Sequence, residues 1–479
     1  MISQINNKYK SLSEPVKASL WFTICGVIQK GISLLTTPIF TRLLTTEQYG
    51  VFSVYLSWYD IISVFATLNL FHGAYNNAMT KYPEKKDGIT SSMQGLTSTI
   101  TIALFVVYIA AHQFWNGVFN LRGIFILAMF AELLFLPGYN FWAAKERYDY
   151  KYKKLIVATL IIAVMAPLLG IVTVLLTEYK SEARVLSYVF VQVCVGLVLY
   201  VHNLRKGKKF FSAEFWKYSL ILNVPLIPHY LSSTILNQAD RIMINNMVGT
   251  SEAAIYSVAY SVASMMTIIT TAIKNTYTPF LYKSLKAKQY DSVKNVSNIL
   301  TVFIAGFTFV AVLLGPEVIM IIAPKSYYDA IWVIPPVACA VFFKFLYPMF
   351  STVEFYHEKT FFILVASCVG AVANIVLNYI FMKQYGYYVA GYTTLFCYIL
   401  YSLGHYIFQR RILKQKGMET GLFDSKFILV ISCILLLAMV ASIFLYKTYI
   451  PRYCILLGII VCFVLWRDKI MHALKTLKK

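Results

Sequence analysis

The sequence predicts an all-α integral membrane protein with about fourteen transmembrane helices. Its 479 residues are 59% hydrophobic and only 13% charged, whereas a soluble protein carries about 45–50% apolar and about 25% charged residues. The apolar residues form continuous runs of about 20, the length that a helix needs to cross the hydrocarbon core. Such runs are too long for the alternating strands of a transmembrane barrel. An ordinary soluble enzyme and a disordered chain are therefore excluded.

Each predicted span is an apolar run between polar or charged segments. The first half of the chain has six runs, at residues 16–40, 50–71, 91–111, 118–142, 155–177 and 185–201. Six more lie at 218–237, 253–273, 296–322, 331–353, 361–382 and 387–408. The last two, at 427–446 and 454–466, are close together and short, so twelve or thirteen spans remain as alternatives. Prolines inside several runs, among them Pro225 and Pro228, predict bends.

The positive charges predict the topology. The formal net charge is +22, from 43 Lys and Arg against 21 Asp and Glu. Most Lys and Arg residues, including Lys274 after the eighth span, fall in loops on the face that also holds both termini. Such loops face the cytoplasm, so both termini are expected inside, with the first span kept as an anchor. Arg184 is among the few on the opposite face. Because the basic residues separate apolar runs, we expect no nucleic-acid partner.

A weak internal repeat predicts two lobes. Arg42 follows the first span and Arg241 the seventh, and in each half a glutamate (Glu47 or Glu252) precedes an aromatic-Ser-Val sequence that opens the next span. The predicted parts are an N-terminal lobe at 1–202, a basic cytoplasmic linker at 203–217, a C-terminal lobe at 218–408, and the last two spans with a cytoplasmic tail at 409–479. A cargo site is expected between the lobes, near the middle of the bilayer.

Catalytic and cofactor motifs are missing from the sequence. It contains no G-x-x-x-x-G-K-[ST] and no D-x-D pair, and its seven histidines never pair at i,i+3 or i,i+4. The eight cysteines are scattered without a C-x-x-C pair and are expected to be buried thiols. We therefore expect no cofactor, no metal and no covalent catalysis, which leaves transport as the leading class.

Polar side chains inside the spans predict a water-accessible cavity. Lys30 and Lys344 each lie near the middle of a span, where a charge is costly unless it faces protein or water. Lysine is a mobile point charge that suits a phosphate or carboxylate cargo. Other polar residues that would line this cavity are Ser33, Thr37, Asn237, Asn374 and Asn378. The alternative is that such small polar residues only let helices pack closely.

Three carboxylates lie within or beside the spans, namely Asp60, Glu132 and Asp240. A carboxylate at membrane depth either pairs with a cation for structural reasons or takes part in function. Both interpretations stay open: the three could balance the lysines and arginines, or bind a coupling ion.

Several segments resemble a known family. The opening of Wzx-type oligosaccharide flippases is similar to this chain at 28–33 (IQKGIS), 37–44 (TPIFTRLL) and 49–50 (YG). The start of their second lobe is similar to 218–220 (YSL), 225–229 (PLIPH), 240–244 (DRIMI) and 255–260 (IYSVAY). These proteins form the polysaccharide transporter family of the multidrug/oligosaccharidyl-lipid/polysaccharide (MOP) exporter superfamily. One departure is Ala254, where the family often has glycine.

The resemblance implies a two-lobed bundle in the bacterial cytoplasmic (inner) membrane. It would flip an undecaprenyl-diphosphate-linked oligosaccharide to the outer leaflet, for O-antigen, capsule or exopolysaccharide assembly, coupled to H⁺ or Na⁺. Further partners would be membrane lipid, a polysaccharide polymerase and a chain-length regulator. A basic central cavity would hold Lys30, Arg42, Arg241 and Lys344, with Asp60, Glu132 and Asp240 as candidates for ion coupling.

Three other functions are alternatives to this one. A lipid II flippase carries a similar lipid-linked cargo, and charge alone does not separate it from the first interpretation. A multidrug or organic-cation exporter of the same superfamily ranks lower, because lysines in the cavity would repel a cationic cargo. A membrane polymerase or glycosyltransferase would need catalytic groups on a large outer loop, and the outer loops are all short.

Overall fold

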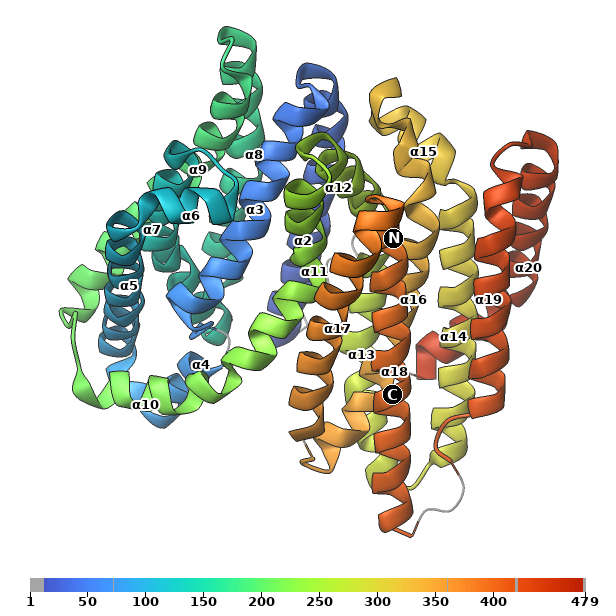
Figure 1. The fold of residues 1–479 in the computed structure, drawn as a ribbon. Coiled ribbons are helices and arrows are strands. Elements are labelled where there is room, and N and C mark those ends of the chain that lie inside the picture. The colour runs from blue at the N-terminus through green and yellow to red at the C-terminus, as the bar shows by residue number, and fades with distance from the viewer. Residues whose placement is uncertain (1–12, 72, 360, 418–420, 477–479) are drawn as a thin grey trace, which may run out of the picture. The chain divides into compact units, whose positions relative to one another are not determined.

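The computed structural model describes residues 13–71, 73–359, 361–417 and 421–476. These residues contain helices and turns but no strand, which confirms the all-α class (Figure 1). They divide into two compact units, with the boundary between Asn246 and Met247. The predicted division into lobes at 202 and 218 stays a prediction. The charges before residue 13 and in the last three residues, which contribute to the topology argument, lie outside the described residues.

The first unit is built from long helices joined by short connections, with short 3₁₀ turns at Pro83–Lys85 and Val224–Leu226 (η1 and η2). Its described α-helices are α2 (Glu14–Leu43), α3 (Thr46–Thr67), α4 (Ala74–Lys81), α5 (Lys86–Ala110), α6 (His112–Phe119), α7 (Gly123–Tyr148), α8 (Tyr152–Leu176), α9 (Lys180–Gly207), α10 (Ala213–Asn223) and α11 (Ile227–Met247).

The second unit has the same construction, with a 3₁₀ segment, η3, at Lys325–Trp332. Its described α-helices are α12 (Thr250–Ser264), α13 (Met266–Lys286), α14 (Tyr290–Leu313), α15 (Gly315–Ile322), α16 (Ile334–Tyr356), α17 (Phe361–Tyr385), α18 (Val389–Gln415), α19 (Ser425–Leu445) and α20 (Tyr449–Thr476).

The number of apolar spans is close to the predicted one. Within the described part of the chain, twelve spans are long and apolar enough to cross a membrane, or thirteen if α12 and α13 form one bent span. The predicted span at 387–408 corresponds to α18, which is long enough but is not among them. Tyrosines dilute its apolar sequence, at positions 392, 398, 401 and 406.

Three predicted spans are broken helices. The seventh is interrupted by η2 between α10 and α11, where Pro225 and Pro228 remove backbone donors as predicted. The eighth is bent by 40° at Met265 and continues to Lys286, beyond its predicted end. The ninth is two helices, because Gly315 and Pro316 begin α15 immediately after α14 ends. Apolar composition alone does not distinguish a straight span from a broken one.

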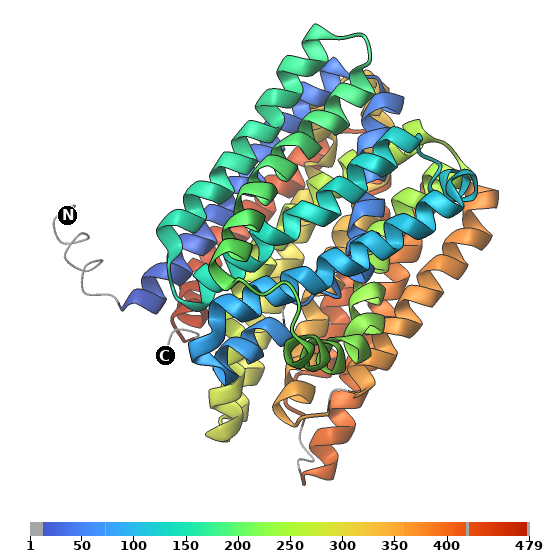
Figure 2. The same ribbon diagram turned by 90° about the vertical axis from the view of Figure 1, so that its left-hand side faces the viewer.

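Glycines allow close helix packing in the first unit, where α7 lies along α9 and α9 along α8 (Figure 2). A Cβ added to Gly138 of α7 would lie 2.7 Å from the backbone of Tyr200 on α9. A Cβ on Gly196 of α9 would lie 2.7 Å from the backbone of Phe135 on α7. Small residues allow such backbone contact between membrane helices. Two glycines on facing helices therefore fix this pair.

The central helix of the second unit is α16, which contacts α12, α13, α14, α18 and α19. Its apolar side chains, including Phe342, Leu346 and Phe350, are buried in the largest part of the core. A helix that is apolar on all sides is expected in such a buried position. The polar residues that α16 does carry, described next, are consequently inside the unit.

Candidate functional site

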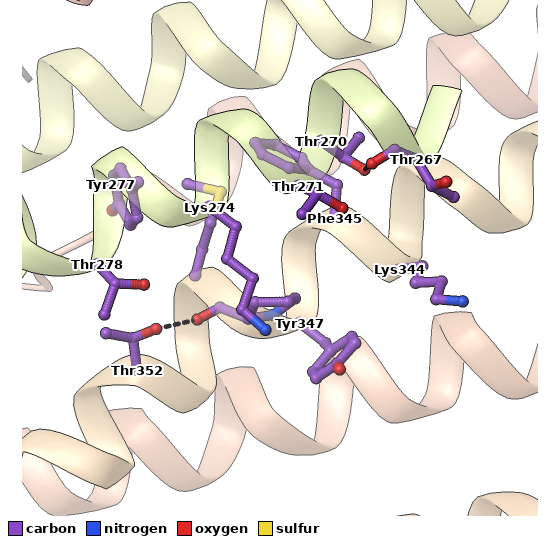
Figure 3. A pocket seen from close by; sticks show the side chains of 12 residues that line it. Thr267, Thr270, Thr271, Lys274, Tyr277, Thr278, Lys344, Phe345, Tyr347 and Thr352 are labelled. Carbon is purple, nitrogen blue, oxygen red and sulfur yellow. Dashed lines mark hydrogen bonds between the residues drawn. The ribbon is translucent and has the colours of Figure 1, made fainter. Parts of the chain in front are cut away.

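A cavity of about 230 Å³ lies between α13 and α16 of the second unit (Figure 3). It is lined by hydroxyl, aromatic and cationic side chains: Thr267, Thr270, Thr271, Lys274, Tyr277, Thr278, Lys344, Phe345, Tyr347, Pro348, Met349 and Thr352. Figure 3 shows Lys274 extending from α13 toward α16, while Lys344 and Tyr347 project from α16 itself. Two ammonium groups and several hydroxyls therefore border one space.

The spacing of residues along α13 explains how it presents a polar face. Thr267, Thr271, Lys274 and Thr278 are separated by four, three and four residues, which places them on one side of a helix. The Thr270 hydroxyl donates a hydrogen bond to the carbonyl oxygen of Thr267 in the same helix, 3.3 Å away. On α16 the half-buried Lys344 lies with its ammonium 5.7 Å from the Tyr398 ring centroid.

The structure places Lys344 in a cavity, whereas Lys274 was missed in the sequence. The predicted eighth span ended at residue 273, and Lys274 was therefore assigned to a cytoplasmic loop. The structure instead places Lys274 inside a helix, because α13 continues through it to Lys286. The signal was present in the sequence as the three- and four-residue spacing of Thr267, Thr271 and Lys274, which continues past the predicted end.

A polar chain joins α3 to α11 in the first unit. The Gln238 side chain donates to the Asp60 carboxylate and accepts a hydrogen bond from Arg241, with Arg241 Nη1 2.6 Å from Gln238 Oε1. Ser57, one turn before Asp60, also donates to Gln238 Oε1 at 3.2 Å. Asp60 and Arg241 interact electrostatically through this arrangement. Two predicted site residues are thus brought together by Gln238, a residue that sequence reasoning did not single out.

Glu132 on α7 belongs to the same polar region. Its side chain is fully buried and accepts a hydrogen bond from the Tyr55 hydroxyl of α3, with an O–O distance of 2.6 Å. Its other carboxylate oxygen has no hydrogen-bond partner among the described residues. Glu132 also interacts electrostatically with Asp60. Two of the three predicted coupling carboxylates therefore lie in one region of the unit.

Arg184 is a buried cation that the sequence argument placed in an outer loop. The structure instead places Arg184 within a helix, because α9 begins at Lys180. The guanidinium lies between two rings, 3.9 Å from the Phe40 centroid and 3.8 Å from the Phe52 centroid. Its Nε and Nη1 donate no hydrogen bond to any described residue. Stacking on aromatic faces is thus a principal stabilising contact of this cation.

The remaining predicted residues of the first unit lie on α2 and α11. Lys30 and Ser33 are exposed on α2, and Thr37 donates to the Ser33 carbonyl at 2.8 Å. At the end of α2, exposed Arg42 donates to the carbonyl of Pro38 at 2.9 Å. On α11, Asn237 donates to the Ser233 carbonyl at 2.6 Å, and Asp240 is buried. Their roles in transport stay predictions.

Asn374 and Asn378 form a separate buried group between α17 and α18. Asn374 donates to the Thr394 hydroxyl at 3.1 Å and Asn378 donates to Asn374 Oδ1 at 3.3 Å. Thr393 completes the group by donating to Asn378. Neither asparagine lines the cavity between α13 and α16.

The described residues place no group of three His, Cys, Asp or Glu where it could hold a metal ion.

Ion pairs connect the helix ends outside the spans of the first unit. Lys86 Nζ lies 2.8 Å from Asp149 Oδ1, and Lys145 pairs with Asp87. Burial alone would raise the pKa of Asp149, but the hydrogen bond and charge of Lys86, together with the charge of Lys151, lower this pKa below its usual value. Asp149 follows α7, so the pair joins that helix end to the start of α5.

Comparison with known proteins identifies a family model and several folds. The model described as "polysaccharide biosynthesis protein" matches residues 16–284.

A lipid II flippase MurJ in the inward closed conformation has a TM-score of 0.68 and 17% identity, covering 94% of this chain and 100% of that one. An inward-facing multidrug resistance MATE family transporter of the MOP superfamily has a TM-score of 0.59 and 13% identity, over 84% and 100%. A MOP superfamily transporter from Pyrococcus furiosus has a TM-score of 0.53 and 13% identity, over 85% and 98%. No curated protein sequence matches. At such identities the structural likeness is one of fold.

Proposed function

Because the chain belongs to the polysaccharide biosynthesis protein family, we propose that it is a flippase for lipid-linked oligosaccharides. The family and the fold are those of MOP-superfamily transporters, as the sequence resemblance implied. In the proposed reaction an undecaprenyl-diphosphate-linked repeat unit moves from the cytoplasmic to the outer leaflet of the bacterial inner membrane. The unit then feeds O-antigen, capsule or exopolysaccharide assembly, with a polymerase and a chain-length regulator as further partners.

The cavity between α13 and α16 is the observation that carries this proposal. Lys274 and Lys344 suit a diphosphate, because an ammonium binds phosphate oxygens without a fixed fork geometry. The threonine hydroxyls around them suit the hydroxyl groups of sugars, as donors and as acceptors. The hydrocarbon tail of such a cargo can stay in the bilayer, so only the polar head needs a hydrated route.

Transport of this kind is proposed to proceed by alternating access coupled to H⁺ or Na⁺. Asp60 and Glu132 are the coupling candidates that the structure supports best, since both lie in the polar region of the first unit and Glu132 keeps one buried oxygen without a partner among the described residues. Asp240 remains a third candidate.

The function is tested in the native host with the gene deleted. Lipid-linked oligosaccharides are extracted and their membrane face is assigned with an impermeant reagent that modifies sugars. We expect accumulation on the inner face and loss of surface polymer, with the cargo identified by mass. A mass that corresponds to lipid II would assign the chain to peptidoglycan synthesis instead. Normal polymer without accumulation, in a host lacking a second flippase, would contradict the proposal.

Charge removal in the cavity tests the proposed site. Lys344→Ala and Lys274→Ala are each expected to lower export about tenfold, since one charge-assisted hydrogen bond contributes about 1.5–3 kcal/mol. Lys30→Ala is expected to lower export in the same direction. Export is measured as surface polymer at matched protein abundance. Lys286→Ala is the control, because Lys286 ends the same helix but lies outside the cavity. Wild-type export by both cavity variants would contradict a cationic site.

A further inference from the structure

A buried carboxylate–imidazole pair joins α16 to α18 in the second unit. Glu354 Oε1 lies 2.8 Å from His405 Nδ1, and both side chains are fully buried. The second oxygen of Glu354 and the second ring nitrogen of His405 have no hydrogen-bond partner in the described part of the chain. One turn further along α18, the amide oxygen of Gln409 is likewise buried without a partner.

Aromatic rings and weakly acidic groups enclose this pair. The rings of Tyr347, Phe362 and Tyr401 lie with centroids 5.8, 5.7 and 4.6 Å from that of His405. The titratable groups that face the pair are Tyr347 from α16 and Tyr401 from α18. Tyr401 also interacts electrostatically with Glu354 and with Cys368 of α17. The described residues of α13, α14 and α19 form no hydrogen bond and no ion pair with Glu354 or His405.

The pair can bind a proton, because each of its two side chains keeps one polar atom that takes part in no hydrogen bond with the described residues. When Nδ1–H donates to Glu354, the free carboxylate oxygen and the other ring nitrogen are both acceptors. A carboxylate beside a neutral imidazole would leave an uncompensated negative charge in an apolar environment, which is costly. The pair therefore favours binding one proton beyond the Nδ1–H, and the free carboxylate oxygen and the free ring nitrogen are the two atoms that can accept it.

Tyr347 connects the pair to the cavity. Its side chain lines the cavity between α13 and α16, and its ring contacts the imidazole of His405. Tyr347 and Glu354 are seven residues apart, which places them two turns apart on one side of α16. An anion beside Lys274 and Lys344 would make the local potential more negative and so favour protonation nearby. Linkage makes this effect reciprocal.

We propose that Glu354 and His405 form a proton-binding site whose occupancy is coupled to an anion in the cavity between α13 and α16. The proton comes from bulk water and binds to the free oxygen of Glu354 or the free nitrogen of His405. The proton site stands by itself, while the coupling rests on the proposed function, because it takes the cargo to carry a diphosphate.

The proton site is tested on the purified full chain in lipid nanodiscs by infrared difference spectroscopy between about pH 9 and about pH 4. We expect the C=O band of a protonated carboxyl to titrate in the wild type and to be reduced in Glu354→Gln, which keeps the shape and the hydrogen bond. His405→Gln is expected to shift the midpoint of the same band. Glu358→Gln is the control, because Glu358 is exposed four residues further on.

An unchanged band in Glu354→Gln, with thermal stability retained, would overturn the proposal. If Glu354→Gln does not fold, nitrogen NMR of the histidines in the wild type tests the proton site instead. The signal of His405 is assigned by its loss in His405→Gln. A His405 signal that does not titrate anywhere in the range would equally overturn it.

The coupling is tested by repeating the titration with undecaprenyl diphosphate. We expect the midpoint to rise by about one pH unit, because a nearby anion disfavours the ionised carboxylate and favours the protonated pair. A double variant, Lys274→Ala with Lys344→Ala, is expected to abolish the rise. Binding without any change in midpoint would overturn the coupling. A band that titrates in a protein that does not bind undecaprenyl diphosphate would support the proton site, overturn the coupling and contradict the proposed function.

Discussion

Arg184 shows how a single cation is kept in the interior of the first unit. A planar guanidinium can stack on two rings at once, whereas an ammonium is a compact and strongly hydrated charge. Phe40 and Phe52 supply those rings from α2 and α3. The side chain therefore connects three helices through contacts that depend on its shape as well as on its charge.

Arg184→Lys is accordingly expected to lower the free energy of unfolding by about 1–2 kcal/mol, because the second stacked contact is lost in a desolvated site. The measurement is thermal unfolding of the protein in detergent. Arg122→Lys serves as the control, since the Arg122 side chain is largely exposed in its pair with Glu182. Equal destabilisation by both changes would mean that the stacking contributes nothing specific.

The residues missed in the sequence share one physical cause. Lys274 lies one position after the predicted eighth span, Glu354 one after the tenth, and Arg184 one before the sixth. A charge near the end of an apolar run is taken as its boundary, so a charged residue close to a helix end is placed just outside the predicted span. Lys344 and Glu132 escaped this error because apolar residues surround them on both sides. The roles of all these residues in transport remain to be measured.

At the scale of elements, the α7–α9 pair depends on two facing glycines. Gly138→Ala or Gly196→Ala places a methyl group within 3 Å of the backbone of the partner helix. The two helices must move apart to accommodate it. Overpacking of this kind costs about 1–3 kcal/mol. We expect a lower unfolding temperature and a lower yield of folded protein for each variant, measured by fluorescence-detected size-exclusion chromatography after heating.

Gly26→Ala provides the comparison for these two changes. Gly26 also lies inside a helix, α2, but an added Cβ would meet nothing within 4 Å. It should therefore match or slightly exceed the wild type, since alanine favours a helix over glycine. Destabilisation of all three variants to the same degree would point to a general effect of backbone change instead.

The ion pair of Lys86 with Asp149 makes the end of α7 sensitive to acid. The folded pKa of Asp149 is lowered, so its contribution to stability is present at neutral pH and is lost as the pH falls through that lowered value, below about 4. Asp149→Asn is expected to be less stable than the wild type at neutral pH, with the difference vanishing in acid. Thermal unfolding across pH measures this. Glu84→Gln, an exposed change nearby, should leave the profile unaltered; a constant deficit in Asp149→Asn would refute the argument.

Prediction of elements from composition succeeded for their existence and failed for their continuity. Each of the fourteen apolar runs corresponds to one or more helices, because a span length of apolar residues is a strong constraint. The bend at Met265 was not predicted, because no proline or charged residue marks it in the sequence. The break at Leu314 coincides with Gly315 and Pro316, which lie inside the predicted ninth span. The prolines at 225 and 228 predicted the break in the seventh span.

At the scale of the whole molecule, the loop charges predict that both termini are cytoplasmic. A fluorescent protein fused after residue 479 is expected to be bright, since it folds in the cytoplasm. Alkaline phosphatase fused near residue 116, between predicted spans three and four, is expected to be active outside. The same enzyme fused near residue 85, in a basic loop predicted to be cytoplasmic, is expected to be inactive. Inverted activities at these three positions would contradict the topology.

The break at Met265 has a mechanical consequence for the cavity. Lys274 and Thr278 stand beyond the break on α13, while α12 stands before it. Lys274 is nine residues from Met265, a lever arm of about 13 Å at 1.5 Å per residue. A change of about 10° in the bend would swing the base of Lys274 by about 2 Å, which is enough to make or break a hydrogen bond. A change of bend at this one joint would thus alter the distance between a cation and its ligand while α12 keeps its packing.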